Sequence, residues 1–201
     1  LLIKAPGVAV VMDFGAGALE LGESIRAQLT DEAVQLSGLQ NPNSVKQLAR
    51  WLSVETGDDI TTLRKETIKE LLGRDNADHV QRMLESRQEL GKTSTKKYDA
   101  IEAAVCDDGR VRGLLQFYGA NRTGRWAGRL VQVQNLPRTY TEPLELAREL
   151  VKGRKLDALR TVYGSPNDTL SQLSRTAFVA ARGNVVIDAD FSAIEARVIS
   201  W

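Results

Sequence analysis

The feature that most constrains this fold is a helical spacing of apolar residues near the start of the chain. Between positions 13 and 39, apolar residues recur every three or four positions: Leu21, Ile25, Leu29, Ala33 and Leu36. This spacing places them on one face of a single amphipathic helix. We therefore expect one long helix, which Gly38 and the turn-forming stretch 41–43 bring to an end.

Shorter helices are expected next along the chain. Ser44 is a favourable N-cap for a helix whose buried face carries Val45, Leu48, Ala49 and Leu52. Gly57 ends this helix, and another short one is predicted over 65–72, stopped by Gly73.

Two further helices flank a basic, hydroxylated segment. Apolar residues have helical spacing over 80–90 and again over 98–105, and the intervening residues are Gly91-Lys92-Thr93-Ser94-Thr95-Lys96-Lys97. We expect a helical hairpin with this segment at its tip.

The pattern changes after the turn at 107–110. Residues 111–118 are predicted to be extended, and 119–137 are rich in Gly, Arg, Asn and Gln. Helices are expected over 143–163 and 169–180, followed by a short apolar strand, Val185–Ile187, and a helix from Ser192 onward. The predicted fold class is α+β and predominantly helical, with a helical part at 1–106 and a part with a few strands at 107–201.

Charge is balanced overall but unevenly distributed. The chain has a net charge of +1, yet from Arg82 to Arg138 there are 11 Lys or Arg against 6 Asp or Glu. This excess indicates either a surface that faces a polyanion or a solvated charged face.

The composition excludes several classes of protein. The single cysteine, Cys106, rules out an internal disulfide, and together with the single histidine, His79, it cannot build a structural zinc site. No apolar run approaches the roughly 18 residues that a membrane span needs. We expect a cytoplasmic protein with no membrane partner, and the oligomeric state stays open.

The junction between the predicted strand and the last helix could hold a metal ion. An aspartate at the carboxyl end of a buried strand, here Asp190, can bind Mg²⁺, which favours one or two carboxylates completed by phosphates and water. Spacing also allows a simpler interpretation, in which Asp190 forms a turn and Ser192 and Glu195 form a capping box. Spacing alone leaves both interpretations open.

The residues that follow Asp190 resemble motif A of the family A DNA polymerases. The stretch 190–197 reads Asp-Phe-Ser-Ala-Ile-Glu-Ala-Arg, similar to the usual Asp-Tyr-Ser-Gln-Ile-Glu-Leu-Arg. The resemblance implies that Asp190 is a catalytic, metal-binding aspartate and that the Phe191 backbone carbonyl is a further metal contact. It also implies that Glu195 is the sugar gate, which excludes a ribose 2′-hydroxyl, and that Arg197 contacts DNA.

Two upstream segments resemble the same family. Arg122-Thr123-Gly124-Arg125 and Val133-Gln134-Asn135-Leu136-Pro137 are similar to its Thr-Gly-Arg and Leu-Gln-Asn-Ile-Pro elements, which implies minor-groove contacts by Thr123, Arg125, Gln134 and Asn135. The predicted hairpin resembles the thumb helices, which implies that DNA contacts come from Arg87, Lys92, Ser94, Thr95, Lys96 and Lys97.

The resemblance implies a DNA-directed DNA polymerase that adds deoxynucleoside triphosphates to a primer–template DNA by two-metal phosphoryl transfer with two Mg²⁺ ions. Residues 1–106 would be the helical thumb and 107–201 the start of the palm. Trp126-Ala127-Gly128 after Thr-Gly-Arg and the long stretch 139–174 are more like phage or prophage enzymes. The chain begins at Leu1 and stops within a predicted helix, so we expect a fragment that is inactive by itself.

Two other interpretations remain open. A non-catalytic helical DNA-binding module would keep the basic hairpin and use Asp190 and Glu195 only for capping. A helical protein-interaction domain would have no affinity for nucleic acid.

Overall fold

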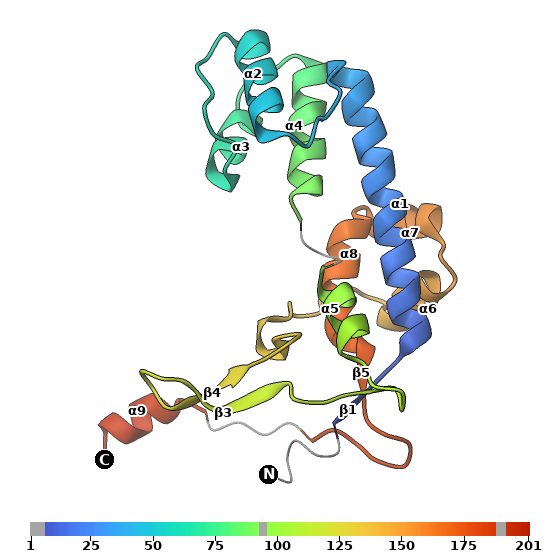
Figure 1. Cartoon of the computed structure of the whole chain (residues 1–201), viewed down its shortest axis with the longest axis vertical. Coiled ribbons are helices and arrows are strands. Elements are labelled where there is room, and N and C mark those ends of the chain that lie inside the picture. The colour runs from blue at the N-terminus through green and yellow to red at the C-terminus, as the bar shows by residue number, and fades with distance from the viewer. Residues whose placement is uncertain (1–6, 93–95, 188–191) are drawn as a thin grey trace.

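The computed structural model describes residues 7–92, 96–187 and 192–201 and confirms a predominantly helical α+β fold (Figure 1). The helices are α1 (Met12–Ser37), α2 (Val45–Thr56), α3 (Lys65–Leu72), α4 (Asp78–Leu90), α5 (Lys96–Ala104), α6 (Leu144–Lys152), α7 (Leu156–Tyr163), α8 (Pro166–Leu173) and α9 (Ile194–Ile199). The strands are β1 (Val8–Val10), β2 (Arg110–Val111), β3 (Leu115–Ala120), β4 (Arg125–Gly128) and β5 (Phe178–Val179), and two 3₁₀ helices are η1 (Val133–Asn135) and η2 (Ser174–Ala177).

The predicted hairpin of two helices around 91–97 is not formed, because each of these helices packs on α1 instead. The helices α4 and α5 do not fold back on each other; they follow one another along α1, against which both pack (Figure 1). The helix α1 has 26 residues, which at about 1.5 Å per residue gives about 39 Å, long enough to cover α4 and α5 in series. The expected hairpin around 91–97 was wrong because apolar spacing identifies a buried face but not the element that covers it.

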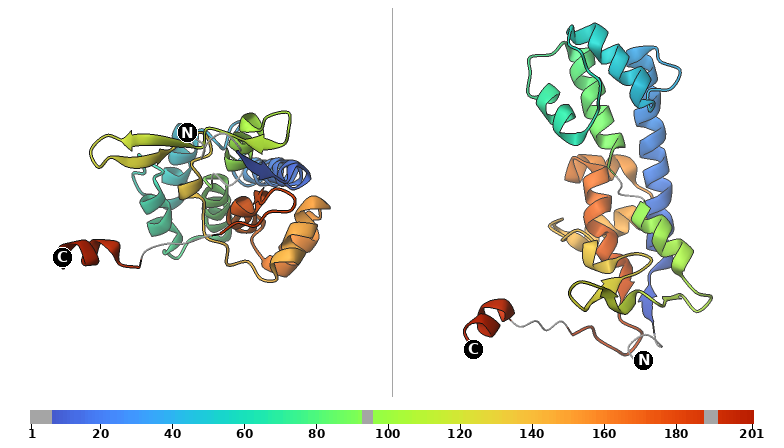
Figure 2. Two further views of the ribbon diagram at one scale, coloured as in Figure 1. Left: turned by 90° about the horizontal axis from the view of Figure 1, so that it is seen from below. Right: turned by 60° about the vertical axis from the view of Figure 1, so that its left-hand side comes forward.

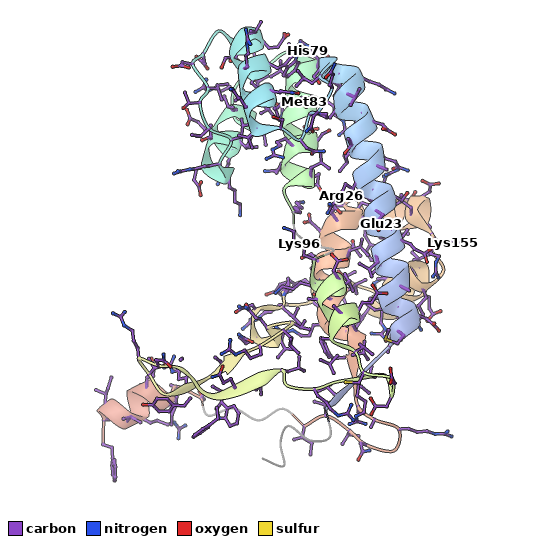
Figure 3. The ribbon with its side chains drawn as sticks, in the orientation of Figure 1. Glu23, Arg26, His79, Met83, Lys96 and Lys155 are labelled. Atoms are coloured by element: carbon purple, nitrogen blue, oxygen red, sulfur yellow. The ribbon has the colours of Figure 1, made fainter. Side chains whose placement is uncertain are left out.

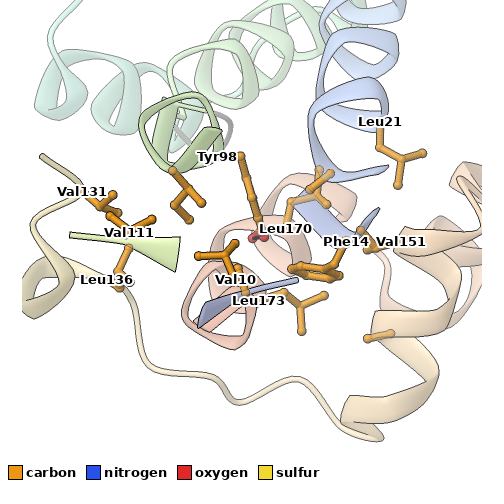
Figure 4. Packing of buried hydrophobic residues seen from close by; sticks show 14 of the residues in the cluster. Val10, Phe14, Leu21, Tyr98, Val111, Val131, Leu136, Val151, Leu170 and Leu173 are labelled. Carbon is orange, nitrogen blue, oxygen red and sulfur yellow. Dashed lines mark hydrogen bonds between the residues drawn. The ribbon is translucent and has the colours of Figure 1, made fainter. Parts of the chain in front are cut away.

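The apolar residues gather in two separate clusters along α1. At the tip, α2, α3 and α4 pack on the C-terminal half of α1 around Leu52, Met83 and Leu84. At the base, α5, α6, α7 and α8 pack on its N-terminal half around Phe14 and Tyr98 (Figure 4). The base cluster takes residues from both sides of position 106, and the predicted boundary at 106/107 stays a prediction.

The base also contains a small antiparallel sheet with strand order β2-β1-β5. Val8 pairs with Val111, and Val10 pairs with Phe178. Extended structure over 111–118 was predicted and is found in part, as β2 and then β3. Strand β1 was not predicted, since three residues carry too short a pattern to distinguish a strand from a loop.

Three other predicted elements are corrected. The helix expected over 143–163 is two helices, α6 and α7, separated at Gly153–Lys155, where Arg154 has a φ of 55°. The helix expected over 169–180 ends earlier, and 178–179 form strand β5. Val185–Ile187 form no strand and are 75–85% exposed, since within the described residues no strand pairs with them.

The capping box at the last helix is also not formed. Helix α9 begins at Ile194 after Ala193, which has a φ of 52° and makes no side-chain cap. Ser192 instead accepts a hydrogen bond through its backbone oxygen from Arg197 Nε, at 2.9 Å. Within the described ranges, no helix combines the length and the apolar character that crossing a membrane requires.

A close approach between α1 and α6 depends on a glycine. A Cβ atom at Gly17 would overlap the carbonyl oxygen of Val151 in α6, which is fully buried. We expect Gly17→Ala to lower the free energy of unfolding by about 1–3 kcal/mol, the usual cost of overpacking. Gly15, on the same helix, has open space around its Cβ position, so Gly15→Ala should raise stability by about 0.5–1 kcal/mol.

Urea unfolding of both variants, followed by circular dichroism, tests both predictions. The free energy of unfolding should fall in Gly17→Ala and rise in Gly15→Ala. Equal effects of the two substitutions would contradict the close packing of α1 on α6.

Candidate nucleic-acid interface

The β3–β4 hairpin carries the Thr-Gly-Arg segment. Thr123 and Gly124 lie in its turn, and both of their backbone N–H groups donate to the Ala120 carbonyl, at 3.0 and 2.9 Å. Gly124 has a φ of 66°, a conformation that glycine adopts without steric cost. Arg125 follows as the first residue of β4, and its side chain is 72% exposed. The turn therefore presents a solvent-facing guanidinium at the end of the hairpin.

Arg125 meets a residue of the motif A segment. Its Nη2 atom donates to Glu195 Oε1 at 3.2 Å, although the two residues are 70 positions apart. The Glu195 side chain is 80% exposed, and such a solvated pair contributes little to stability. The pair matters for the geometry of the site, because it places the guanidinium of the Thr-Gly-Arg segment beside the carboxylate of the motif A segment.

The Gln-Asn segment lies against the same hairpin. Gln134 is part of η1, and its side-chain amide packs so closely on Gly128 of β4 that a Cβ atom there would overlap it. Asn135 Nδ2 donates to Gln132 Oε1 at 3.0 Å. Gln134 also lines a mainly apolar cavity of about 490 Å³ next to β2 and β5. Gly128 therefore allows the Gln-Asn turn to lie directly on the Thr-Gly-Arg strand.

The hairpin also carries an exposed aromatic cluster. The rings of Phe117 and Trp126 lie 5.2 Å apart and nearly perpendicular, and Tyr118 lies 6.3 Å from Phe117. Gln116 pairs with Ala127, so Phe117 and Trp126 follow neighbouring positions of the two strands. In the sequence, Trp126 stands out only as a departure from the family pattern. Pairing the two segments as a hairpin was the signal that could have revealed the cluster.

Two of the predicted phosphate-binding lysines lie at the start of α5. Lys96 is exposed and faces the junction of α4 and α5 (Figure 3), whereas Lys97 is half-buried and donates to the Val131 carbonyl at 3.3 Å. That hydrogen bond connects α5 to the loop before η1. Arg87 is half-buried in the last turn of α4.

Lys92 is held by two carboxylates. Its Nζ atom donates to Glu89 Oε1 at 2.6 Å and to Asp168 Oδ1 at 2.8 Å. Partial burial disfavours the charged form, but the hydrogen bonds to Asp168 and Glu89 outweigh it and raise the pKa of Lys92 above its ordinary value. This lysine is therefore charged at neutral pH and already has anionic partners. Asp168 was not singled out from the sequence, where it lies in a polar turn without any distinguishing signal.

The remaining predicted residues are only partly described. Asp190, Phe191, Ser94 and Thr95 lie outside the described residues. Arg197 lies in α9 and is exposed. Within the described ranges, no group of three or more His, Cys, Asp or Glu side chains could hold a metal ion.

Comparison with known proteins gives two findings. Residues 18–201 match the family described as DNA polymerase family A. A protein of Bacillus phage SP02 named DNA polymerase is 53% identical over 199 residues, which cover 99% of this chain and 31% of the phage protein. The chain thus spans about a third of the length of this relative.

Proposed function

Because this chain belongs to DNA polymerase family A, we propose that it is the primer–template-binding part of a DNA-directed DNA polymerase. The contact that best supports this assignment is the 3.2 Å hydrogen bond between Arg125 and Glu195. It joins the Thr-Gly-Arg segment, assigned to the DNA minor groove, to the motif A segment, assigned to the incoming nucleotide. A site that extends a primer needs these two groups side by side.

Arg125, Gln134 and Asn135 would contact the minor groove near the primer end. The groove presents acceptors that are shared by A·T and T·A pairs and largely by G·C pairs, so donors can contact it without selecting a sequence. Packing of Gln134 on Gly128 keeps the turn close to Arg125. Thr123, in the hairpin turn, would contact the same strand.

The junction of α4 and α5 would grip the phosphate backbone. Arg87, Lys92, Lys96 and Lys97, with Ser94 and Thr95, are the donors in this role. Phosphate contacts position a protein on duplex DNA without carrying sequence information, which suits an enzyme that copies any template. The start of α5 and the β3–β4 hairpin lie on the same side of α1 (Figure 1).

The motif A segment would supply the chemistry. The Asp190 carboxylate and the Phe191 backbone carbonyl are hard oxygen donors, which suit Mg²⁺. When bound, two such ions would activate the primer 3′-hydroxyl and stabilise the charge that develops on the transferred phosphoryl group. Glu195 would exclude a ribose 2′-hydroxyl from the incoming nucleotide, and Arg197 would contact DNA.

Fluorescence anisotropy with labelled primer–template duplex, single-stranded DNA and an RNA hairpin tests the DNA-binding part of this proposal. At physiological salt we expect a Kd for the duplex on the order of 10⁻⁴–10⁻⁶ M that weakens as salt rises. Lys96→Ala should lower the slope of log K against log salt by about 0.9, the value for one phosphate contact. Arg125→Ala should weaken binding of the duplex more than that of the single strand.

Lys155 provides the matched control, since it is an exposed lysine on the opposite side of α1 from the α4–α5 junction (Figure 3). Lys155→Ala should leave the salt slope unchanged. Absence of duplex binding at low salt, in a sample whose circular dichroism shows a folded protein, would refute the proposal and favour a protein-interaction domain.

A further inference from the structure

The tip and the base meet through polar groups where α4 ends. A groove of about 660 Å³ lies between α1, α4 and the segment that leads into α8. Glu85, Gln88 and Glu89 line it from α4, and Arg160 and Asn167 line it from α7 and α8. Apolar residues of the two clusters do not interdigitate across this groove, so polar contacts connect the end of α4 to α8.

Two residue pairs, Glu89 with Asn167 and Lys92 with Asp168, connect the end of α4 and the residue that follows it to α8. Asn167, only 8% exposed, donates through Nδ2 to Glu89 Oε2 at 3.2 Å and to the Glu89 carbonyl at 3.5 Å. Lys92 donates to Asp168 at 2.8 Å across 76 positions of sequence. The position of Asp168 is set by the first turn of α8, where its backbone N–H donates to the Ser165 Oγ cap at 3.3 Å.

We propose that Asp168 competes with a DNA phosphate for Lys92 and thereby sets how tightly this protein binds DNA. This inference rests on the proposed function, because it requires DNA to approach the α4–α5 junction. Asp168 would occupy the ammonium group of Lys92 in the DNA-free protein and release it when a phosphate arrives.

The charges and exposures at the cluster support this role. Two carboxylates face the Lys92 ammonium group, so a phosphate can bind this group fully only when one carboxylate gives way. The Asp168 side chain is 53% exposed, compared with 30% for Glu89 and 28% for Lys92. Glu89 lies three positions before Lys92 and is held by Asn167, so Asp168 is the carboxylate that can be displaced.

The strength of the contact suits displacement. An ion pair whose carboxylate is half-exposed is weak enough for a phosphate contact to replace it. Because Asp168 belongs to α8 in the base and Lys92 follows α4 in the tip, the exchange would also loosen one connection between tip and base.

The test is DNA binding by Asp168→Asn, which keeps the side-chain shape and removes its charge. We expect the duplex Kd to fall by about 1.4- to fivefold, the range that an exposed ion pair contributes. Asp157 is the control. Its side chain is 98% exposed, and like Asp168 it pairs with a cationic side chain, here that of Arg160. Asp157→Asn should change the Kd less than Asp168→Asn does, and in a Lys92→Ala background the gain from Asp168→Asn should vanish.

A second readout does not require DNA. Acetylation with N-hydroxysuccinimidyl acetate, followed by peptide mass spectrometry, reports how available the Lys92 amine is. Asp168→Asn should increase labelling of Lys92 relative to Lys155 in the same sample. Thermal unfolding by circular dichroism checks that the variant is folded.

The outcomes separate the two proposals. If Lys96→Ala weakens duplex binding but Asp168→Asn does not strengthen it beyond the Asp157 control, the inference about Asp168 is refuted and the proposed function stands. Unchanged Lys92 labelling in Asp168→Asn also refutes it, since the pair would then not restrict the amine. If the wild-type protein binds no duplex, both proposals are refuted.

Discussion

Primer extension by a hybrid polymerase is expected to fall on the order of 10³-fold when Asp190 is replaced by asparagine. In the hybrid, this chain replaces the matching segment of the Bacillus phage SP02 DNA polymerase, to which it is 53% identical over 199 residues. Bound metal ions contribute several kcal/mol of transition-state stabilisation, and each 1.4 kcal/mol changes a rate about tenfold. Asparagine keeps the size of the side chain but removes the anionic oxygen that would hold Mg²⁺.

The experiment measures single-nucleotide extension of a labelled primer with Mg²⁺ and, in parallel, binding of the same duplex. Binding should be nearly unchanged, because the loss belongs to the chemical step. Asp188→Asn is the matched control, since this carboxylate lies two positions before Asp190 in the same segment. Extension that survives Asp190→Asn would refute the catalytic role proposed for Asp190.

Phe14→Ala is expected to lower the free energy of unfolding by about 3–5 kcal/mol, the range found for buried phenylalanines. The Phe14 ring is fully buried in the base cluster. It packs edge-on against Tyr98 at 6.0 Å between ring centroids (Figure 4). The Arg148 guanidinium lies 5.3 Å from the centre of the Phe14 ring. Alanine would remove both contacts and leave a cavity between α1, α5 and α6.

Hydrogen exchange followed by mass spectrometry, with urea unfolding on the same samples, measures this effect and locates it. Loss of protection should concentrate in α5, α6 and α8, whereas Leu84→Ala, at a fully buried residue of the tip cluster, should affect α2 and α3 first. Equal loss of protection everywhere in Phe14→Ala would show that tip and base unfold as one unit, contrary to the two separate clusters.

Helices that depend on local signals were predicted well. The bounds of α1, α2 and α3 agree with the predicted ranges to within a few residues. Gly38 and Gly57 end α1 and α2 in the left-handed conformation, and Ser44 accepts a hydrogen bond from the Gln47 N–H at 3.4 Å. Capping and apolar periodicity act within a few residues, so a single sequence contains the information for them.

Structure that depends on a distant partner was predicted poorly. Sequence reasoning paired the helices around 91–97 with each other, whereas both pack on α1. It assigned a strand to Val185–Ile187, where no partner strand lies alongside, and missed β1, which β2 and β5 stabilise from both sides. Apolar character marks such segments for burial or pairing, but the partner comes from elsewhere in the chain.

The same distinction holds for the candidate site. The identity of the segments follows from the sequence alone: the Thr-Gly-Arg turn, the Gln-Asn turn and the motif A residues lie within 18–201, which match DNA polymerase family A. Their neighbours follow from the folded chain, in which Arg125 meets Glu195 across 70 positions and Lys92 meets Asp168 across 76. Each residue type fixes the chemistry of its own side chain. Which charged side chains become neighbours depends on how α1, α4 and α8 pack and on where the β3–β4 hairpin lies.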